Sequence, residues 1–264
     1  MIVLALLLNV ALIVAAIVLL LHRQELPGYL SGVIPALFLA PFAAFILIRF
    51  QYWSTIANGV EVTSKQFPEI WGLLQELFPV MGFTADAPRA NDRIPRVYLV
   101  NGNGVMNAFA SKCAVTRGYV VLHSDLVDTA YDHGNIEGLR FVLAHELAHI
   151  KCGHVSIWRT ILHPALALLR LDTSLTRAQE YTADRTAAFV SPHGALEVAR
   201  ILYAGKHMGA RMDLDEYMHS MTTHKDGIWL RIVNLLSSHA VGFRRMEALR
   251  AASQGQWDVH GRML

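Results

Sequence analysis

The chain has 264 residues, 53% of them hydrophobic, and its mean hydropathy is positive. An ordinary soluble domain is less apolar than this. The net charge is only +2 and no basic cluster is present, which argues against nucleic acid as a partner. Two cysteines, Cys113 and Cys152, are too few for a disulfide framework.

The apolar excess lies at the N-terminus. An apolar run from Ile2 to Leu21 is interrupted only by Asn9, and a second run, residues 30–48, contains two prolines. Both are long enough to cross a bilayer as helices, and membrane helices tolerate proline. A cleaved signal peptide is the alternative for the first run, but no basic segment precedes it and no small-residue cleavage site follows it. We therefore expect residues 1–50 to form a transmembrane hairpin that anchors the chain in a lipid bilayer, followed by one domain at 51–264.

The predicted domain mixes helices with a few strands. Apolar side chains recur at helical spacing from Thr63 to Met81, where Thr63 or Ser64 is the expected cap. Three short segments have strand character, and two longer ones have helical character. In chain order these are Arg96–Val100, Ala108–Ala114, Gly118–Leu122, Asn135–Gly153 and Ser174–Phe189. From Ala195 the chain is predicted to be mostly helical, with loops near Asp213 and His224. We expect an α+β fold, a small sheet packed against several helices.

The segment from Val155 to Leu171 is apolar but contains two arginines and a His-Pro pair. The stretch between the arginines is too short to span a bilayer. It is predicted to be a buried or interfacial helix rather than a third transmembrane span.

Residues 145–149 read HELAH. Each residue of an α-helix turns the chain by about 100°, so His145 and His149 lie one turn apart and both imidazoles reach one ion. Glu146 lies beside them, where its carboxylate binds the attacking water rather than the metal. Zinc acidifies such a water and polarises a peptide carbonyl. The pattern predicts one catalytic Zn²⁺ per chain, with Glu146 as the catalytic base.

The residues alone do not fix the third ligand. His154 fails the metzincin spacing and would point away from His145 on a continued helix, so we interpret it as a residue at the helix C-terminus. Glu180 and Asp184 lie one turn apart on one helix face, so that one could bind zinc and the other could orient a zinc histidine. The alternative is that both acids are solvated and pair with nearby arginines, Arg177 or Arg185.

These motifs resemble those of the HtpX-type membrane zinc endopeptidases, relatives of the CAAX prenyl endopeptidase. The matching segments are NAFASK at 107–112, LAHELAHIKCGH at 143–154 and RAQEYTAD at 177–184, together with His239 and Arg245. The resemblance covers most of the chain after Gln51. It implies a mostly helical zincin-type metallopeptidase domain with a small sheet, in which Glu180 is the third zinc ligand and Asp184 orients a zinc histidine.

The resemblance also assigns residues that contact substrate. Asn107, Ala108 and Phe109 are expected to border the substrate groove, and His239 and Arg245 to hold the substrate or the oxyanion. The chain departs from the family where His149 and Glu180 are too close in sequence for two further membrane helices between them. The His-Pro of the family is also His-Ala here. An extended peptide could add to an edge strand, for which residues 108–114 are the candidate, although an inner strand has the same periodicity.

Two functions of different classes follow. The first is an endopeptidase that hydrolyses membrane or membrane-proximal proteins, with protein or peptide substrates and a role in bacterial envelope quality control. The resemblance places it in the inner membrane, with its catalytic domain on the cytoplasmic side. The second is a non-catalytic, membrane-anchored binding module in which zinc only stabilises the fold. A structural zinc site has four protein ligands and needs no general base, so Glu146 favours catalysis. A prenyl-protein protease is less favoured because it has more membrane helices.

Overall fold

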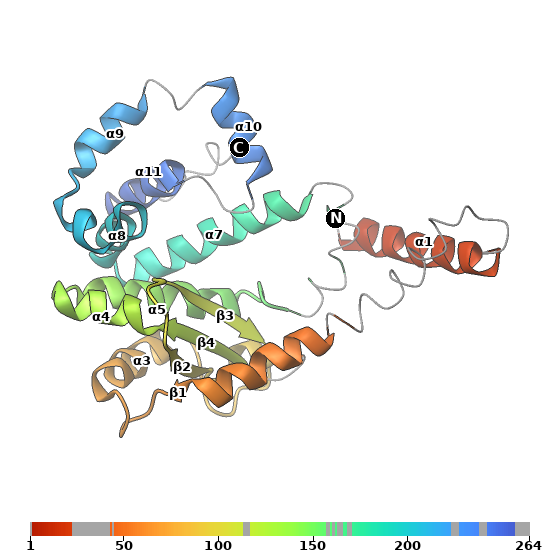
Figure 1. Ribbon diagram of the computed structural model, residues 1–264, viewed down its shortest axis with the longest axis horizontal. Coiled ribbons are helices and arrows are strands. Elements are labelled where there is room, and N and C mark those ends of the chain that lie inside the picture. The colour runs from red at the N-terminus through yellow and green to blue at the C-terminus, as the bar shows by residue number, and fades with distance from the viewer. Residues whose placement is uncertain are drawn as a thin grey trace.

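The computed structural model describes residues 2–22, 43, 45–112, 117–156, 159, 162, 166–167, 171–222, 227–237 and 242–256. These residues form a mostly helical molecule with one small mixed sheet (Figure 1). The helices are α1 (Ile2–Leu21), α3 (Pro68–Val80), α4 (Ser124–Asp132), α5 (Ile136–Lys151), α7 (Leu171–Val190), α8 (Gly194–Met208), α9 (Leu214–Thr222), α10 (Ile228–Leu236) and α11 (Gly242–Ser253). Two single 3₁₀ turns, η2 (Ala90–Asp92) and η3 (Gly209–Arg211), connect them, and residues 45–58 are also helical.

The sheet has four strands in the order β1-β2-β4-β3: β1 (Val60–Glu61), β2 (Arg96–Val100), β4 (Gly118–His123) and β3 (Ala108–Lys112). The two outer strands pair antiparallel with their neighbours, whereas β2 and β4 are parallel. Strand β3 therefore lies at an edge, which decides the alternative that periodicity left open. The predicted strands are confirmed as β2, β3 and β4, and residues 113–116 lie outside the description.

Successive side chains of a strand point to opposite faces, so the sheet carries two cores. Val120 and Leu122 of β4 pack into the main core with α3, α4 and α5. Tyr119 and Val121 face the other way and pack with Tyr52 of the helix at 45–58. Figure 1 shows α5 and α7 stacked on the sheet, with α8 to α11 beyond them. The helix that carries HELAH is thus covered on both sides.

Helix α5 follows its predicted range closely. The side chain of Asn135 caps it by accepting a hydrogen bond from the N–H of Gly138 at 2.8 Å. Five of its apolar side chains are wholly buried: Leu143, Ala144, Leu147, Ala148 and Ile150. This burial fixes the rotation of the helix and therefore the direction in which His145 and His149 point.

The predicted start of α3 at Thr63 is wrong, and so is the predicted cap. The helix begins at Pro68, whose fixed φ and missing N–H suit a first helical turn. Phe67 before it has a left-handed backbone, with φ of 58°, which stops the helix from extending backwards. Thr63 instead closes a short turn by accepting a hydrogen bond from the N–H of Gln66 at 3.1 Å.

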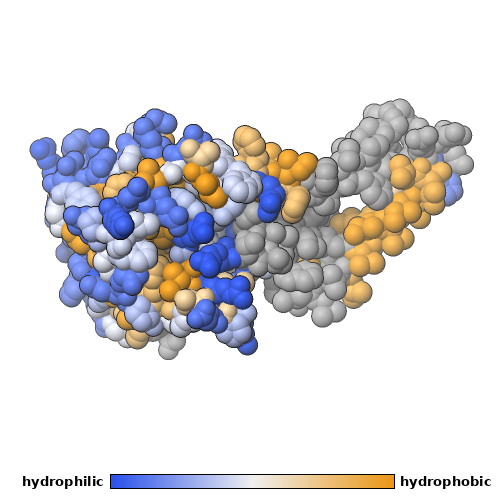
Figure 2. Space-filling view, turned by 90° about the horizontal axis from the view of Figure 1, so that it is seen from below, coloured by the Kyte–Doolittle hydropathy of each residue, from blue (hydrophilic) through white to orange (hydrophobic). Residues whose placement is uncertain are grey.

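The N-terminal segment is described only in part. Its first apolar run is the helix α1, which exposes many large apolar side chains and forms the orange stretch at one end of Figure 2. In the part of the chain that the structure describes, no helix meets the length and hydropathy needed to cross a membrane. Residues 23–42 and 44 of the predicted hairpin, most of 155–171 and His224 lie outside the described residues. The hairpin stays a prediction.

Helix α8 packs on α5 through a glycine. A Cβ on Gly194 would overlap the carbonyl oxygen of Glu137 and lie 2.9 Å from the Cβ of Phe141. Gly194→Ala should therefore lower the free energy of unfolding by about 1–3 kcal/mol, as overpacking does. Urea denaturation of the purified chain measures this. Gly72→Ala is the control: nothing lies within 4 Å of its new Cβ, and alanine in a helix should add about 0.5–1 kcal/mol. Equal stability of the two variants would contradict this packing.

Candidate metal centre

The two histidines of HELAH point into one space. They lie one turn apart on α5, and their Nε2 atoms are 3.1 Å apart. Both side chains are largely buried, with exposed fractions of 11% and 14%. The helical spacing predicted this arrangement, and the structure has it.

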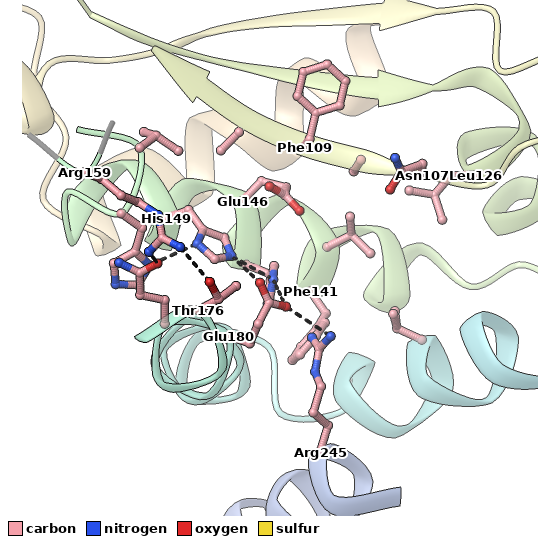
Figure 3. Close-up of a pocket in the computed structure, with 18 residues that line it drawn as sticks. Asn107, Phe109, Leu126, Phe141, Glu146, His149, Arg159, Thr176, Glu180 and Arg245 are labelled. Atoms are coloured by element: carbon pink, nitrogen blue, oxygen red, sulfur yellow. Dashed lines mark hydrogen bonds and ion pairs between the residues drawn. The ribbon is translucent and has the colours of Figure 1, made fainter. Parts of the chain in front are cut away.

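Glu180 of α7 completes the group. Its Oε2 lies 3.8 Å from Nε2 of His145, and its Oε1 lies 3.6 Å from Nε2 of His149. All three ligand atoms lie within 4.8 Å of one another. Figure 3 shows the side chains of His149 and Glu180 pointing toward one another. Zinc bonds of about 2.1 Å in a tetrahedron place neighbouring ligand atoms about 3.4 Å apart. Separations of 3.1 to 3.8 Å bracket that value, so the triad fits a zinc ion, and the described residues supply three ligands rather than four.

Asp184 lies one turn beyond Glu180 and contacts the other side of His145. Its Oδ1 is 2.9 Å from Nδ1 of His145, the distance at which a carboxylate fixes a tautomer. Only 1% of Asp184 and 8% of Glu180 is exposed, so the alternative of two solvated acids is wrong. Arg177, one suggested partner, donates to the carbonyl of Ser237 and the hydroxyl of Ser174.

Arg245 of α11 holds both acids. Its Nε and Nη2 donate to the two oxygens of Asp184 at 2.8 and 2.7 Å, and its Nη1 lies 3.1 Å from Oε2 of Glu180. Burial alone would raise the pKa of Asp184, but Arg245 and His145 hold it well below its usual range. Asp184 is therefore a carboxylate at neutral pH, able to accept the proton on Nδ1 of His145.

The histidine that sequence reasoning missed is His154. Its Nδ1 lies 2.9 Å from Nδ1 of His149. The prediction assumed a continued helix, but α5 ends at Lys151 and Gly153 has a left-handed φ of 74°, which turns the chain back. Burial, with the nearby His145 and His154, lowers the pKa of His149 to about 3. Its imidazole is therefore neutral at pH 7, as a metal ligand must be.

Glu146 is buried beside the triad without belonging to it. Burial raises the pKa of its carboxyl, while the positive form of His145 and a hydrogen bond from the backbone of Ala110 oppose the rise. Ala110 is in β3, so this contact connects the helix to the edge strand. A raised pKa brings a carboxylate closer to the range in which it both takes and returns a proton.

These groups share a pocket of about 380 Å³. The residues predicted to border the substrate groove, Asn107, Ala108 and Phe109, lie along it, as do Glu146 and Arg245 (Figure 3). The structure thus brings together the predicted site residues that it describes. His239 lies outside the described residues, and its role and that of Arg245 toward the oxyanion stay predictions.

Comparison with known proteins gives two findings. The family model described as Peptidase family M48 matches residues 72–171, which include both histidines and Glu146 and end before Glu180. A plastoglobule-localized metallopeptidase 48, chloroplastic, of Arabidopsis thaliana is 28% identical over 151 residues. That alignment covers 52% of this chain and 40% of the relative, so less than half of the relative is spanned. No solved structure matches the chain.

Removing one of three ligands should abolish tight metal binding. Glu180→Ala is expected to purify without stoichiometric zinc, because two imidazoles alone leave the site half open. Elemental analysis after dialysis against a weak chelator measures this. Glu216→Ala, an exposed acid on α9, is the control and should keep the wild-type zinc content. Full zinc in Glu180→Ala would mean that another group is the third ligand.

Asp184→Asn tests the partner of His145. Asparagine keeps the shape but loses the charge that Arg245 and His145 share, so zinc affinity should fall by about 10- to 100-fold. Competition with a fluorescent chelator measures the change. The matched control is Asp215→Asn, whose partner Arg250 forms an exposed pair of little energetic weight. Identical affinities for the two variants would remove Asp184 from the metal centre.

Proposed function

We propose that this chain is a zinc-dependent metallopeptidase of the HExxH type. The observation that carries the proposal is that Glu146 lies in the same pocket as His145, His149 and Glu180. Three ligands leave a fourth position for water or substrate, whereas a structural zinc site is closed by four protein ligands. The match to peptidase family M48 and the metallopeptidase relative support the same activity.

Each group has a separate task in the proposed mechanism. A bound zinc ion would polarise the peptide carbonyl and acidify water. Glu146 takes the proton from the attacking water and passes it to the leaving amine. Asp184 keeps the proton of His145 on Nδ1, so that Nε2 carries the lone pair toward the metal position. Arg245 keeps Glu180 and Asp184 in place and lies near enough to the pocket to assist the developing oxyanion.

The substrate would add to the sheet as a further strand. The N–H of His123 donates to the carbonyl of Asn107 at 3.0 Å, so Asn107 faces inward toward β4. Backbone groups alternate along an antiparallel pair, so those of Ala108, Ala110 and Lys112 point away from the sheet. The backbone of Ala110 donates to Glu146, so the backbone groups of Ala108 and Lys112 and the carbonyl of Ala110 are the ones offered to a peptide. An extended peptide pairs with such an edge through its main chain, largely independently of its sequence. The pocket lies on this side, so pairing brings a peptide bond to Glu146.

We further propose that the protein is anchored by its N-terminal segment and cleaves membrane or membrane-proximal proteins in quality control. The exposed apolar side chains of α1 and the resemblance to the HtpX-type endopeptidases support this. A plastoglobule-localized relative is also named for a lipid structure, although its name concerns that protein alone.

The decisive variant is Glu146→Gln. It should retain one zinc per chain and lose nearly all turnover, because glutamine cannot accept the proton of the attacking water. Casein hydrolysis and zinc content, measured on the same preparations, test both statements. Glu137→Gln is the control, since this acid is on the same helix but outside the pocket and should leave both unchanged. Binding of casein with no hydrolysis by any preparation would favour the non-catalytic zinc-stapled module.

A further inference from the structure

The pocket has two chemically different ends. At one end lie the apolar side chains of Leu126, Val142 and Val198, which also line a small recess of about 20 Å³. At the other end lies the guanidinium of Arg159, beyond His149 and His154. Figure 3 shows Arg159 and Leu126 on opposite sides of the metal ligands. The reaction described above gives Arg159 no task.

Arg159 is held in place by neutral groups. Its Nη1 donates to Oε1 of Gln179 and its Nη2 to Oγ1 of Thr176 at 2.6 Å. Thr176 in turn donates to the backbone carbonyl of Asp172 at 2.8 Å, which orients its hydroxyl. These acceptors fix the position of the guanidinium but do not neutralise it. Both lie on α7, the helix that supplies Glu180.

The charge of Arg159 has no direct counter-ion in the described part of the chain. Burial removes water from the guanidinium and lowers its pKa, whereas the negative charges of Asp172 and Glu180 raise the pKa. The other arginine of the pocket, Arg245, is by contrast paired with both Asp184 and Glu180. A poorly hydrated cation without an ion pair is costly, and an arriving carboxylate would relieve that cost.

The direction of the edge strand says where that carboxylate lies in the substrate. Leu126 and Val142 line the pocket with Ala108, at the start of β3. At the other end of the strand, Lys112 pairs with Gly118, next to Ile150 near the end of α5. Arg159 follows α5, and Figure 3 shows it on the far side of His149 and Glu180 from Asn107, the residue before β3. Antiparallel pairing, the more stable kind, sets the amino-terminal half of a peptide at the end of β3.

We propose that Arg159 binds an acidic side chain of the substrate on the amino-terminal side of the scissile bond. This inference rests on the peptidase function proposed above. The opposite end of the pocket then receives an apolar residue from the carboxyl-terminal side. The substrate class is an extended peptide that changes from acidic to apolar across the cleaved bond.

Two peptides test the inference. They share an apolar residue after the scissile bond and differ only in carrying glutamate or glutamine at the positions before it. Wild-type enzyme should cleave the glutamate peptide with a kcat/KM about 10- to 100-fold higher, mostly through KM, the scale of a charged hydrogen bond. Arg159→Gln should erase the difference, and Arg159→Lys should keep part of it. Arg89→Gln, an exposed arginine outside the pocket, should behave as wild type.

A charge exchange separates recognition from a structural role. Arg159→Glu should prefer a lysine peptide over the glutamate peptide, a reversal that a merely destabilised pocket cannot produce. If Arg159→Gln retained zinc and lowered kcat/KM equally for the glutamate and glutamine peptides, the inference would be overturned and the peptidase function would stand.

Binding gives a readout independent of turnover. Fluorescence anisotropy with zinc-loaded Glu146→Gln should show tighter binding of the glutamate peptide, and the double variant Glu146→Gln with Arg159→Gln should not. Failure of the wild-type enzyme to cleave any peptide would contradict the proposed function. The difference in affinity between the glutamate and glutamine peptides, measured by anisotropy, would still decide whether Arg159 selects an acidic side chain. Equal binding of both peptides would overturn the inference.

Discussion

The structure depends on one buried network of charges, in which Asp184 and Glu180 of α7 meet Arg245 of α11 and His145 of α5. Charged groups out of water must be paired, and removing one partner of a buried pair typically costs about 3–5 kcal/mol. The network therefore constrains three helices at once. Its geometry also sets the metal centre, because the acid that orients His145 and the acid that faces both imidazoles share one arginine.

The helix α5 serves the core and the site with different faces. Most of its apolar residues are buried in the core that it shares with the sheet and α7, and this packing fixes the rotation of the helix. The packed helix therefore sets the direction of three side chains of the site, those of His145, Glu146 and His149. Groups on rigid, packed elements hold the narrow tolerances that catalysis needs. The turn at Gly153, which returns His154 to His149, adds support from outside the helix.

The edge strand and the pocket together explain how a peptide substrate would be bound and selected. In the proposed function, outward backbone groups of β3 would bind an extended chain of any sequence, so they would contribute affinity without selectivity. Selectivity must then come from side chains at the two ends of the pocket, which are apolar near Leu126 and cationic at Arg159. The metal ligands lie between these ends. A substrate with the matching order of residues would be placed with its scissile bond beside Glu146.

The sequence by itself determined the local features: the two histidines of HELAH on one helix face, Glu180 and Asp184 one turn apart, and the three predicted strands. These follow from periods of about 3.6 and 2 residues, which a short segment carries alone. Only the tertiary structure decided that β3 is an edge strand, that His154 turns back to His149, and that Arg159 faces the pocket. Sheet order and the approach of distant helices depend on long-range packing and on the pairing of buried charges. The periodicity of a short segment contains no information about these long-range contacts.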